Sequence, residues 1–156
     1  MGKVARGIVK NVDEVIAELN KALADEWLAY MQYTFAASLT AAPPLEAALK
    51  DVAKEELEHA EEITERIIQL GGKPIADPKQ FAEKTNCGYE VPNEDVKKVL
   101  KDAIKGEGCA IKVYERIAKM TKETDLITFE LMLHIMKEEE EHEEKFENLL
   151  DYMTCE

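Results

Sequence analysis

The sequence has few cysteines, no long apolar run and a shortage of positive charge, and each shortage excludes a class of protein. Three cysteines in 156 residues are too few for a disulfide framework, and none forms the Cys-x-x-Cys pair of zinc and rubredoxin-type sites. No stretch approaches the ~18 unbroken apolar residues of a membrane span, and residues 1–10 lack the apolar core of a signal peptide. We therefore expect a cytoplasmic protein.

The shortage of positive charge bears on the partners of the protein. Lysine and arginine number 20 against 33 aspartates and glutamates, which gives a net charge of -13. Such a chain is repelled by phosphate backbones and anionic membranes, and cations are its natural partners. Near the N-terminus only Lys3, Arg6 and Lys10 could contact a nucleic acid. We expect no direct DNA binding and no membrane partner.

Four long segments carry apolar residues at steps of three and four, which is the period of an amphipathic helix. They predict an all-α fold in a single domain spanning residues 1–156, with helices at about 11–40, 44–71, 93–120 and 125–152. Asn11 and Asn93 are the expected N-caps of the first and third helices. We expect Pro43-Pro44 to end the first helix and Gly71-Gly72 to end the second.

The connections between these helices predict the topology. The first and last pairs are joined by a few residues, so each pair is an antiparallel hairpin, whereas roughly twenty residues (73–92) join the two hairpins. At 3.3 Å per residue this link can extend over ~66 Å, and a helix of about 27 residues is ~40 Å long. The link can therefore cross the whole length of a four-helix bundle.

Each apolar seam is interrupted by polar residues near the middle of its helix. A seam residue faces the core, so these side chains should point inward, and mid-helix residues meet at one level whichever way each helix runs. The six residues concerned are Glu26, Glu56, His59, Glu107, Glu139 and His142. The sequence thus places four carboxylates and two imidazoles in one buried cluster.

The two hairpins also repeat one another. The glutamates Glu26 and Glu107 are 81 residues apart (107 minus 26), and the Glu-x-x-His pairs are 83 apart (139 minus 56). Seven residues after Glu26 and Glu107 come Tyr33 and Tyr114, which we expect to hydrogen-bond carboxylates of the cluster. A site with approximate two-fold symmetry suits two metal ions.

The charge of the cluster indicates which ligand it needs. Four carboxylates in an apolar core repel one another, and some would protonate unless two divalent cations balanced them. Oxygen and imidazole donors without a thiolate suit iron or manganese, with zinc as a further substitute. Two alternatives are a metal-free partner-binding module, which buried carboxylates disfavour, and a solvated acidic face, which the run Glu138–Glu141 would fit.

At these residues the sequence resembles the ferritin superfamily over nearly its full length. The segments Glu56-Leu-Glu-His59-Ala-Glu-Glu and Glu65-Arg-Ile-Ile-Gln-Leu-Gly-Gly-Lys-Pro74 look bacterioferritin-like. The resemblance implies a ferritin-like four-helix bundle with one long crossover and a di-iron site. It also implies that Glu56 and Glu139 bridge the irons, that Glu26 and Glu107 are terminal ligands, and that each iron has one histidine. Bacterioferritins have their haem-ligand methionine at the position of Leu57, so no haem is expected.

The sequence is similar, more specifically, to Dps-like thioferritins, which carry one cysteine in the crossover and another just after the third-helix glutamate. Cys87 and Cys109 occupy these places. The resemblance implies a disulfide beside the irons, which could relay electrons or clamp the crossover; two unpaired thiols are the alternative. Cys155 is interpreted as incidental. The resemblance also implies a shell of twelve subunits.

The function expected from this resemblance is oxidation of Fe(II) by hydrogen peroxide or O₂, storage of ferric iron in the shell and protection from oxidative stress. The alternatives are a di-iron or dimanganese peroxide-reducing enzyme that stores no iron, and a bacterioferritin. Trp27 and Tyr30 are expected near the metals, mainly as packing residues. His134 lies more than one turn before Glu139 and is expected at the surface or a pore.

Overall fold

The computed structural model describes residues 2–154, which form four long helices and two short ones and contain no strand. The long helices are α2 (Val12–Leu39), α3 (Pro43–Gln69), α5 (Val96–Thr121) and α6 (Leu126–Thr154), and the short ones are α1 (Lys3–Ile8) and α4 (Pro78–Lys84). Cys155 lies outside the described residues, as does the side chain of Arg6. The predicted all-α fold class is confirmed.

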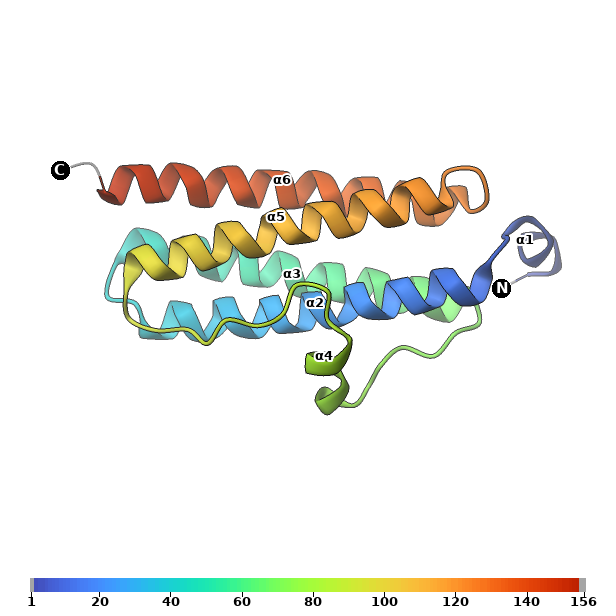
Figure 1. Cartoon of the computed structure of the whole chain (residues 1–156), viewed down its shortest axis with the longest axis horizontal. Helices are drawn as coiled ribbons and strands as arrows, with labels where there is room; N and C mark the ends of the chain where they lie inside the picture. The colour runs from blue at the N-terminus through green and yellow to red at the C-terminus, as the bar shows by residue number, and fades with distance from the viewer. Residues whose placement is uncertain (1, 155–156) are drawn as a thin grey trace.

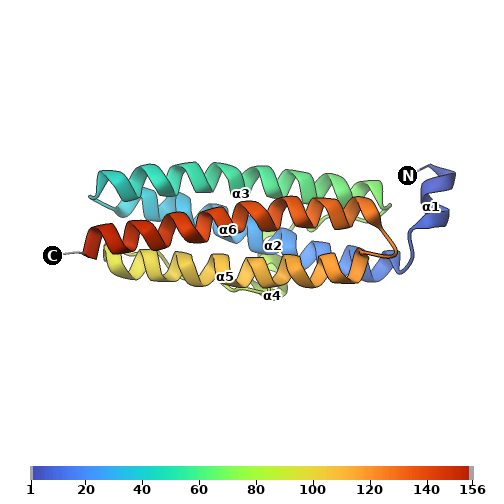
Figure 2. The ribbon, with the colours of Figure 1, turned by 90° about the horizontal axis from the view of Figure 1, so that it is seen from above.

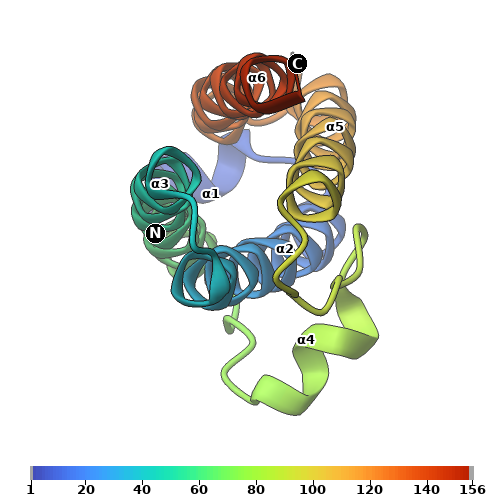
Figure 3. The same ribbon diagram turned by 90° about the vertical axis from the view of Figure 1, so that its left-hand side faces the viewer.

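The four long helices surround one core (Figure 3). Each of α2 and α6 has α3 on one side and α5 on the other, so the two hairpins α2–α3 and α5–α6 pack face to face. Figure 2 shows α6 in front, between α3 on one side and α5 on the other, with α2 behind it. None of the described helices is long and apolar enough to cross a membrane.

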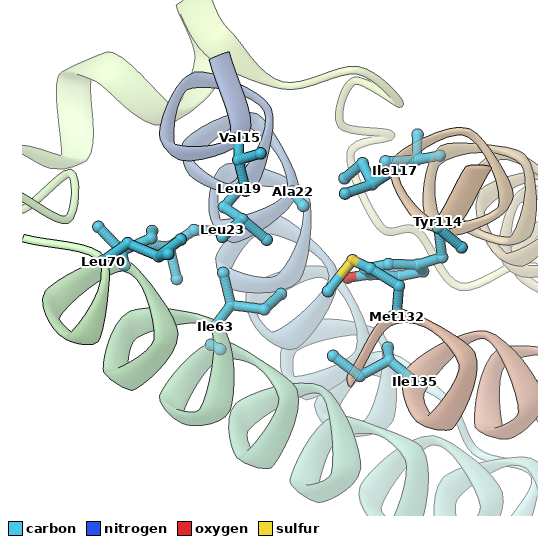
Figure 4. Packing of buried hydrophobic residues seen from close by; sticks show 14 residues of the cluster. Val15, Leu19, Ala22, Leu23, Ile63, Leu70, Tyr114, Ile117, Met132 and Ile135 are labelled. Atoms are coloured by element: carbon cyan, nitrogen blue, oxygen red, sulfur yellow. The ribbon is translucent and has the colours of Figure 1, made fainter. Parts of the chain in front are cut away.

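The core consists of two apolar clusters, one toward each end of the bundle. One cluster contains Leu19 and Leu23 of α2 with Ile63, Ile117 and Ile135 of the other long helices (Figure 4). The other contains residues 33–37 of α2, 45–53 of α3, 99–103 of α5 and Phe146 of α6. On every long helix the polar residues of the predicted cluster fall between the two, so the bundle has a polar layer in the middle of its core.

The link between the hairpins is more structured than the sequence predicts. The Gly72 amide donates to the carbonyl of Ile67, and Gly71 has a φ of +86°, which together end α3 in a Schellman motif. The link then forms α4, whose Phe81 stacks on Trp27 of α2 with ring centroids 6.3 Å apart. From α4 the chain runs along α2 to the start of α5 (Figure 1). The crossover is thus packed against α2.

Asn11 is the N-cap residue of α2, as predicted, but Asn93 is not the N-cap of α5. Asn11 has a left-handed backbone with a φ of 55°, and its side chain makes no capping hydrogen bond to α2. The N-cap of α5 is Asp95, whose side chain accepts from the amide of Lys98. Asn93 instead accepts from the amide of Asp95 and shapes the turn before the helix. Pro43 stands in the first turn of α3, where a missing amide hydrogen costs nothing.

Candidate metal centre

The structure brings all six predicted residues together in the polar layer. Each is at most 2% exposed: Glu26, Glu56, His59, Glu107, Glu139 and His142. The two clusters above and below supply the apolar packing that holds the helices in register, so the carboxylates meet in a region from which water is largely excluded.

The six residues form two overlapping groups, each large enough to surround one cation. Glu26 and His59 belong to the first group and Glu107 and His142 to the second, while Glu56 and Glu139 belong to both. Within each group, one potential ligand atom per residue lies within 4.8 Å of the others. The two shared carboxylates come from α3 and α6, and the two unshared ones from α2 and α5. This arrangement is compatible with a two-metal site.

Each imidazole is oriented by an outer carboxylate at its Nε2, while its Nδ1 lies near the shared carboxylates. Nδ1 of His59 lies 3.1 Å from Oε1 of Glu139, and its Nε2 lies 2.7 Å from Oε2 of Glu138. Nδ1 of His142 lies 3.3 Å from Oε2 of Glu139, and its Nε2 lies 2.7 Å from Oε2 of Glu55. When the N–H group at Nε2 donates a hydrogen bond to the outer carboxylate, the lone pair on Nδ1 is free to bind a metal.

Glu55 and Glu138 are candidate site residues that the sequence interpretation missed. Each immediately precedes a shared glutamate, and each serves the histidine of the opposite helix, so the two contacts are related by the repeat. The doubled glutamates of Lys54-Glu55-Glu56 and Lys137-Glu138-Glu139 were the signal that could have revealed them. Their half-exposed positions make them look like ordinary surface acids.

The two repeated tyrosines hydrogen-bond the unshared glutamates across the hairpins. The hydroxyl of Tyr33 on α2 donates to Glu107 on α5, and that of Tyr114 on α5 donates to Glu26 on α2. Burial and the neighbouring carboxylates raise the pKa of both phenols, so each keeps its proton and remains a donor. The tyrosines therefore fix one oxygen of each unshared glutamate and leave the other toward the centre.

The charged groups of the cluster strongly affect one another's pKa values. Burial, followed by the charges of Glu56 and Glu139, raises the pKa of Glu26 and of Glu107 well above the ordinary range. Burial opposes ionisation of Glu56 as well, but contacts with the two histidines bring its pKa below the ordinary range. Burial alone would lower the pKa of His142, yet Glu139 and Glu56 raise it to about 10. Without metal, the cluster thus retains protons to balance its charge.

The cluster also contains polar atoms that no protein group satisfies. Five buried side-chain atoms of the described residues lack a hydrogen-bond partner; one is Oε2 of Glu62, and the four in the cluster are Oε2 of Glu26, Oε1 of Glu56, Oε1 of Glu139 and Nδ1 of His59. Unpaired buried polar atoms are costly unless a ligand satisfies them. All four belong to the group around His59. Their donor chemistry fits divalent cations bound by oxygen and imidazole nitrogen.

A disulfide and a buried carboxylate fix the crossover beside this centre. Cys87 is bonded to Cys109 of α5, with their Cα atoms 5.8 Å apart. Asp25, the residue before Glu26, accepts hydrogen bonds from the amides of Asn86 and Cys87 at 2.8 and 2.9 Å. It also accepts from the side chains of Thr85 and Asn86. The sequence interpretation did not identify Asp25, because one more acid beside Glu26 carries no distinct signal.

Three other predicted positions lie away from the centre. Trp27 faces α4, where Phe81 covers its indole ring, and Tyr30 packs edge-on against that ring with centroids 6.0 Å apart. Both aromatics thus make packing contacts, and Trp27 also packs against the apolar cluster that contains Leu23. His134 is half-exposed, and its Nε2 lies 3.7 Å from carboxylate oxygens of Glu62 and Glu138.

Comparison with known proteins yields a consistent set of relatives. Residues 16–155 match the family model described as a ferritin-like domain. The DNA protection during starvation protein of Pyrococcus furiosus is 32% identical over 145 residues, covering 90% of this chain and 78% of that protein. The bacterioferritin of Desulfovibrio desulfuricans is 31% identical over 140 residues, covering 87% of this chain and 74% of that protein.

Solved structures agree with these sequence matches. A dodecameric thioferritin, the bacterioferritin-related protein of Bacteroides fragilis, superposes with a TM-score of 0.91 at 36% identity, over 97% of this chain and 92% of that one. The D. desulfuricans bacterioferritin, solved with its di-iron site in different catalytic states, superposes with a TM-score of 0.78 at 28% identity, over 98% of this chain and 85% of that one.

Proposed function

The chain belongs to the ferritin family, and from this premise we propose that it oxidises Fe²⁺ at the centre described above and stores the ferric product in an oligomeric shell. The observation that carries the proposal is the pair of overlapping ligand groups, which share Glu56 and Glu139 and are buried in the middle of the bundle. Hydrogen peroxide or O₂ is the proposed oxidant, and the cytoplasm the proposed compartment.

Fe²⁺ is a substrate in this reaction. Each of two ferrous ions gives up one electron, and peroxide takes both electrons with two protons to yield two waters; the metal pair supplies the electrons and the site for the oxidant. Glu56 and Glu139, which both groups share, would hold both ions, while Glu26 with His59 and Glu107 with His142 would complete the two ligand sets. Four carboxylates balance the charge of two divalent ions, so the protons held by the metal-free cluster leave as metal binds.

The remaining contacts of the centre position its ligands. Tyr33 and Tyr114 hold the unshared glutamates, and Glu55 and Glu138 hold the imidazoles with Nδ1 toward the metals. Leu57 offers no donor atom for a haem iron. The disulfide of Cys87 and Cys109 lies beside the centre, where it either relays electrons or clamps the crossover. We propose iron, with manganese or zinc as substitutes, as the bound metal.

A shell of twelve subunits is the proposed assembly. Its support is the 36% identity with the dodecameric B. fragilis thioferritin over nearly the full length of both chains. The net charge of -13 would attract ferrous ions to such a shell. Removal of ferrous iron and peroxide together would protect the cell from oxidative stress, a role in keeping with the name of the P. furiosus relative.

The test loads the metal-free protein with Fe²⁺ and peroxide and measures particle mass and iron per subunit. We expect a particle of about twelve subunits with far more than two iron atoms per subunit. A variant with Glu56→Gln and His59→Gln should lose oxidation, whereas Glu58→Gln, on the exposed face of the same helix, should not. A small oligomer that holds only two irons per subunit would overturn the storage role and favour a peroxide-reducing enzyme. Unchanged iron oxidation in the double variant would overturn the assignment of the site.

A further inference from the structure

We propose that Fe²⁺ reaches the centre through a path between the crossover and α5, and that the ion pair of Glu90 and Lys105 at its mouth sets the rate of uptake. This inference rests on the proposed function and gives two residues outside the ligand set a role in iron uptake. Glu90 belongs to the crossover and Lys105 to α5, and Nζ of Lys105 lies 2.9 Å from Oε1 of Glu90.

A cavity connects the ion pair to the ligands. It has a volume of about 50 Å³, and its lining includes Glu26 and Glu107 at the inner end and Gly88, Glu90 and Lys105 at the outer end. A single water needs roughly 10–15 Å³ of such space, so the cavity has room for a few waters or for a partly hydrated ion. The same space therefore joins the exposed surface to carboxylates that are otherwise fully buried.

The wall of the path is held in place on both sides. The amide of Glu90 donates to Oε1 of Gln32 at 2.9 Å, which fixes the crossover to α2 at the mouth. Cys87 also lines the cavity, and its disulfide to Cys109 fixes the crossover to α5. The amides of Asn86 and Cys87 are bound by Asp25. Because the backbone is anchored, the side chains at the mouth are the parts free to move.

The charges along the path are mostly negative and favour a cation, and Lys105 is the exception because it is positive. Seven carboxylic acids line the cavity, and Lys105 is the one basic residue among its lining side chains. Lys105 is 71% exposed and Glu90 43% exposed, so their ion pair is weak and an arriving cation can displace the ammonium group. Glu90 then captures the cation, while the charge of Lys105 opposes its approach.

This arrangement predicts opposite effects for the two residues. The probe is Co²⁺, whose visible absorption changes when oxygen and nitrogen ligands bind it. Its uptake is followed by stopped-flow absorption, and no peroxide is needed. At low ionic strength we expect Lys105→Met to speed uptake and Glu90→Gln to slow it, each by about three- to tenfold, with the double variant between them. Added salt should shrink both effects. All variants should bind the same amount of Co²⁺ at equilibrium.

Glu115 and Lys119 supply the matched control. They form an ion pair on the same helix at 2.6 Å, with Lys119 also 71% exposed, and neither lines the cavity. Glu115→Gln and Lys119→Met make the same changes in net charge and should leave the uptake rate unchanged. If the substitutions in both pairs changed the uptake rate equally, overall charge would explain the effect and the proposal would be overturned. Unchanged rates for Glu90→Gln and Lys105→Met would also overturn it. Failure of the unaltered protein to bind two Co²⁺ per subunit would instead overturn the proposed function.

Discussion

Each histidine of the centre is held by an outer carboxylate that lies outside the two candidate ligand groups. For His59 this is Glu138, at 2.7 Å from Nε2. Carboxylates in this position fix the tautomer and the ring orientation, and their loss typically costs 10–100-fold in metal affinity. Glu138→Gln should therefore weaken binding of Co²⁺ or Zn²⁺ about tenfold or more, as measured by calorimetric titration with a competing chelator.

The control for this variant is Glu141→Gln. Glu141 lies on the same helix, is exposed and pairs only with Lys137 among the described residues, at 3.6 Å. It makes no contact with the imidazoles, so its replacement should leave the affinity unchanged. If Glu138→Gln bound metal as tightly as the unaltered protein, the outer carboxylate would have no part in orienting His59.

The metal-free protein should lose stability as the pH rises above about 4.5, and more steeply above about 6.5. The pKa of His142 is raised from 6.5 to about 10, and those of Glu26 and Glu107 are also raised. In this range the folded state holds more protons than the unfolded state, so the free energy of unfolding falls as pH rises. The fall is about 1.4 kcal/mol per pH unit for each extra proton. Below about pH 4.5 the lowered pKa of Glu56 reverses the slope.

Urea unfolding in the presence of a chelator, at intervals from pH 6.5 to 9.5, measures this slope. His142→Gln should flatten it, whereas His134→Gln should not, because that imidazole is half-exposed and outside the cluster. Saturation with Zn²⁺ should also flatten it, since bound metal displaces the protons. A free energy of unfolding that stayed constant or rose over this range would contradict the charge balance inferred for the cluster.

The six residues of the cluster were predictable because each breaks an apolar seam at mid-helix. A buried carboxylate in a repeating apolar pattern is conspicuous, and the two-fold repeat reinforces it. Glu138 was not predictable in the same way, since it lies in a run of four glutamates that fits a solvated face. That interpretation is right for Glu140 and Glu141, which are exposed. Which glutamate of the run contacts Nε2 of His59 depends on how α3 and α6 pack against each other. The metal itself remains a prediction.

At the scale of whole elements, Asp25 couples the crossover to α2. Its carboxylate accepts hydrogen bonds from two amides and two side chains of the segment 85–87. Asp25→Asn places an amide group among these donors and leaves at least one of them unsatisfied, at a cost of about 1–3 kcal/mol. We expect the amides of 85–88 to exchange hydrogen faster, with little change in α3 and α6.

Hydrogen exchange with mass spectrometry measures this effect, and Asp13→Asn is the control. Asp13 is exposed in the first turn of the same helix and contacts no part of the crossover, so its replacement should leave exchange in 85–88 unaltered. Unchanged exchange in Asp25→Asn would mean that the disulfide alone fixes this segment to the bundle.

The long helices were predictable from periodicity, whereas the irregular segments were not. The seams of α2, α3, α5 and α6 extend over six turns or more, so an error of a residue at either end hardly alters them. The short α4 has too few residues for a period, and its position depends on Phe81 finding Trp27 on a distant helix. The cap of α5 was missed for a related reason: Asp95 and Asn93 are both good cap residues, and the turn between them decides which one serves.

At the scale of the whole molecule, metal binding should raise stability, because the metal-free bundle buries four carboxylates at one level. A ligand that binds only the folded state at 100 times its dissociation constant stabilises it by about 2.7 kcal/mol per site. Zn²⁺, which brings no redox chemistry, should therefore raise the thermal midpoint measured by calorimetry, and a chelator should reverse the rise. Mg²⁺ at the same concentration should have little effect, since it keeps its water and disfavours imidazole. Equal midpoints with and without Zn²⁺ would contradict a two-metal site.

The disulfide has a topological consequence for the molecule. Residues 87–109 form a closed covalent ring, one side of which is the last part of the crossover and the other the first half of α5. Val91, in the open part of the ring, is 74% exposed and accessible to a protease. A single cut there opens the ring but leaves both hairpins in one covalent molecule, and only a cut combined with reduction separates them. The last part of the crossover is therefore joined to α5 twice, once by the chain and once by sulfur.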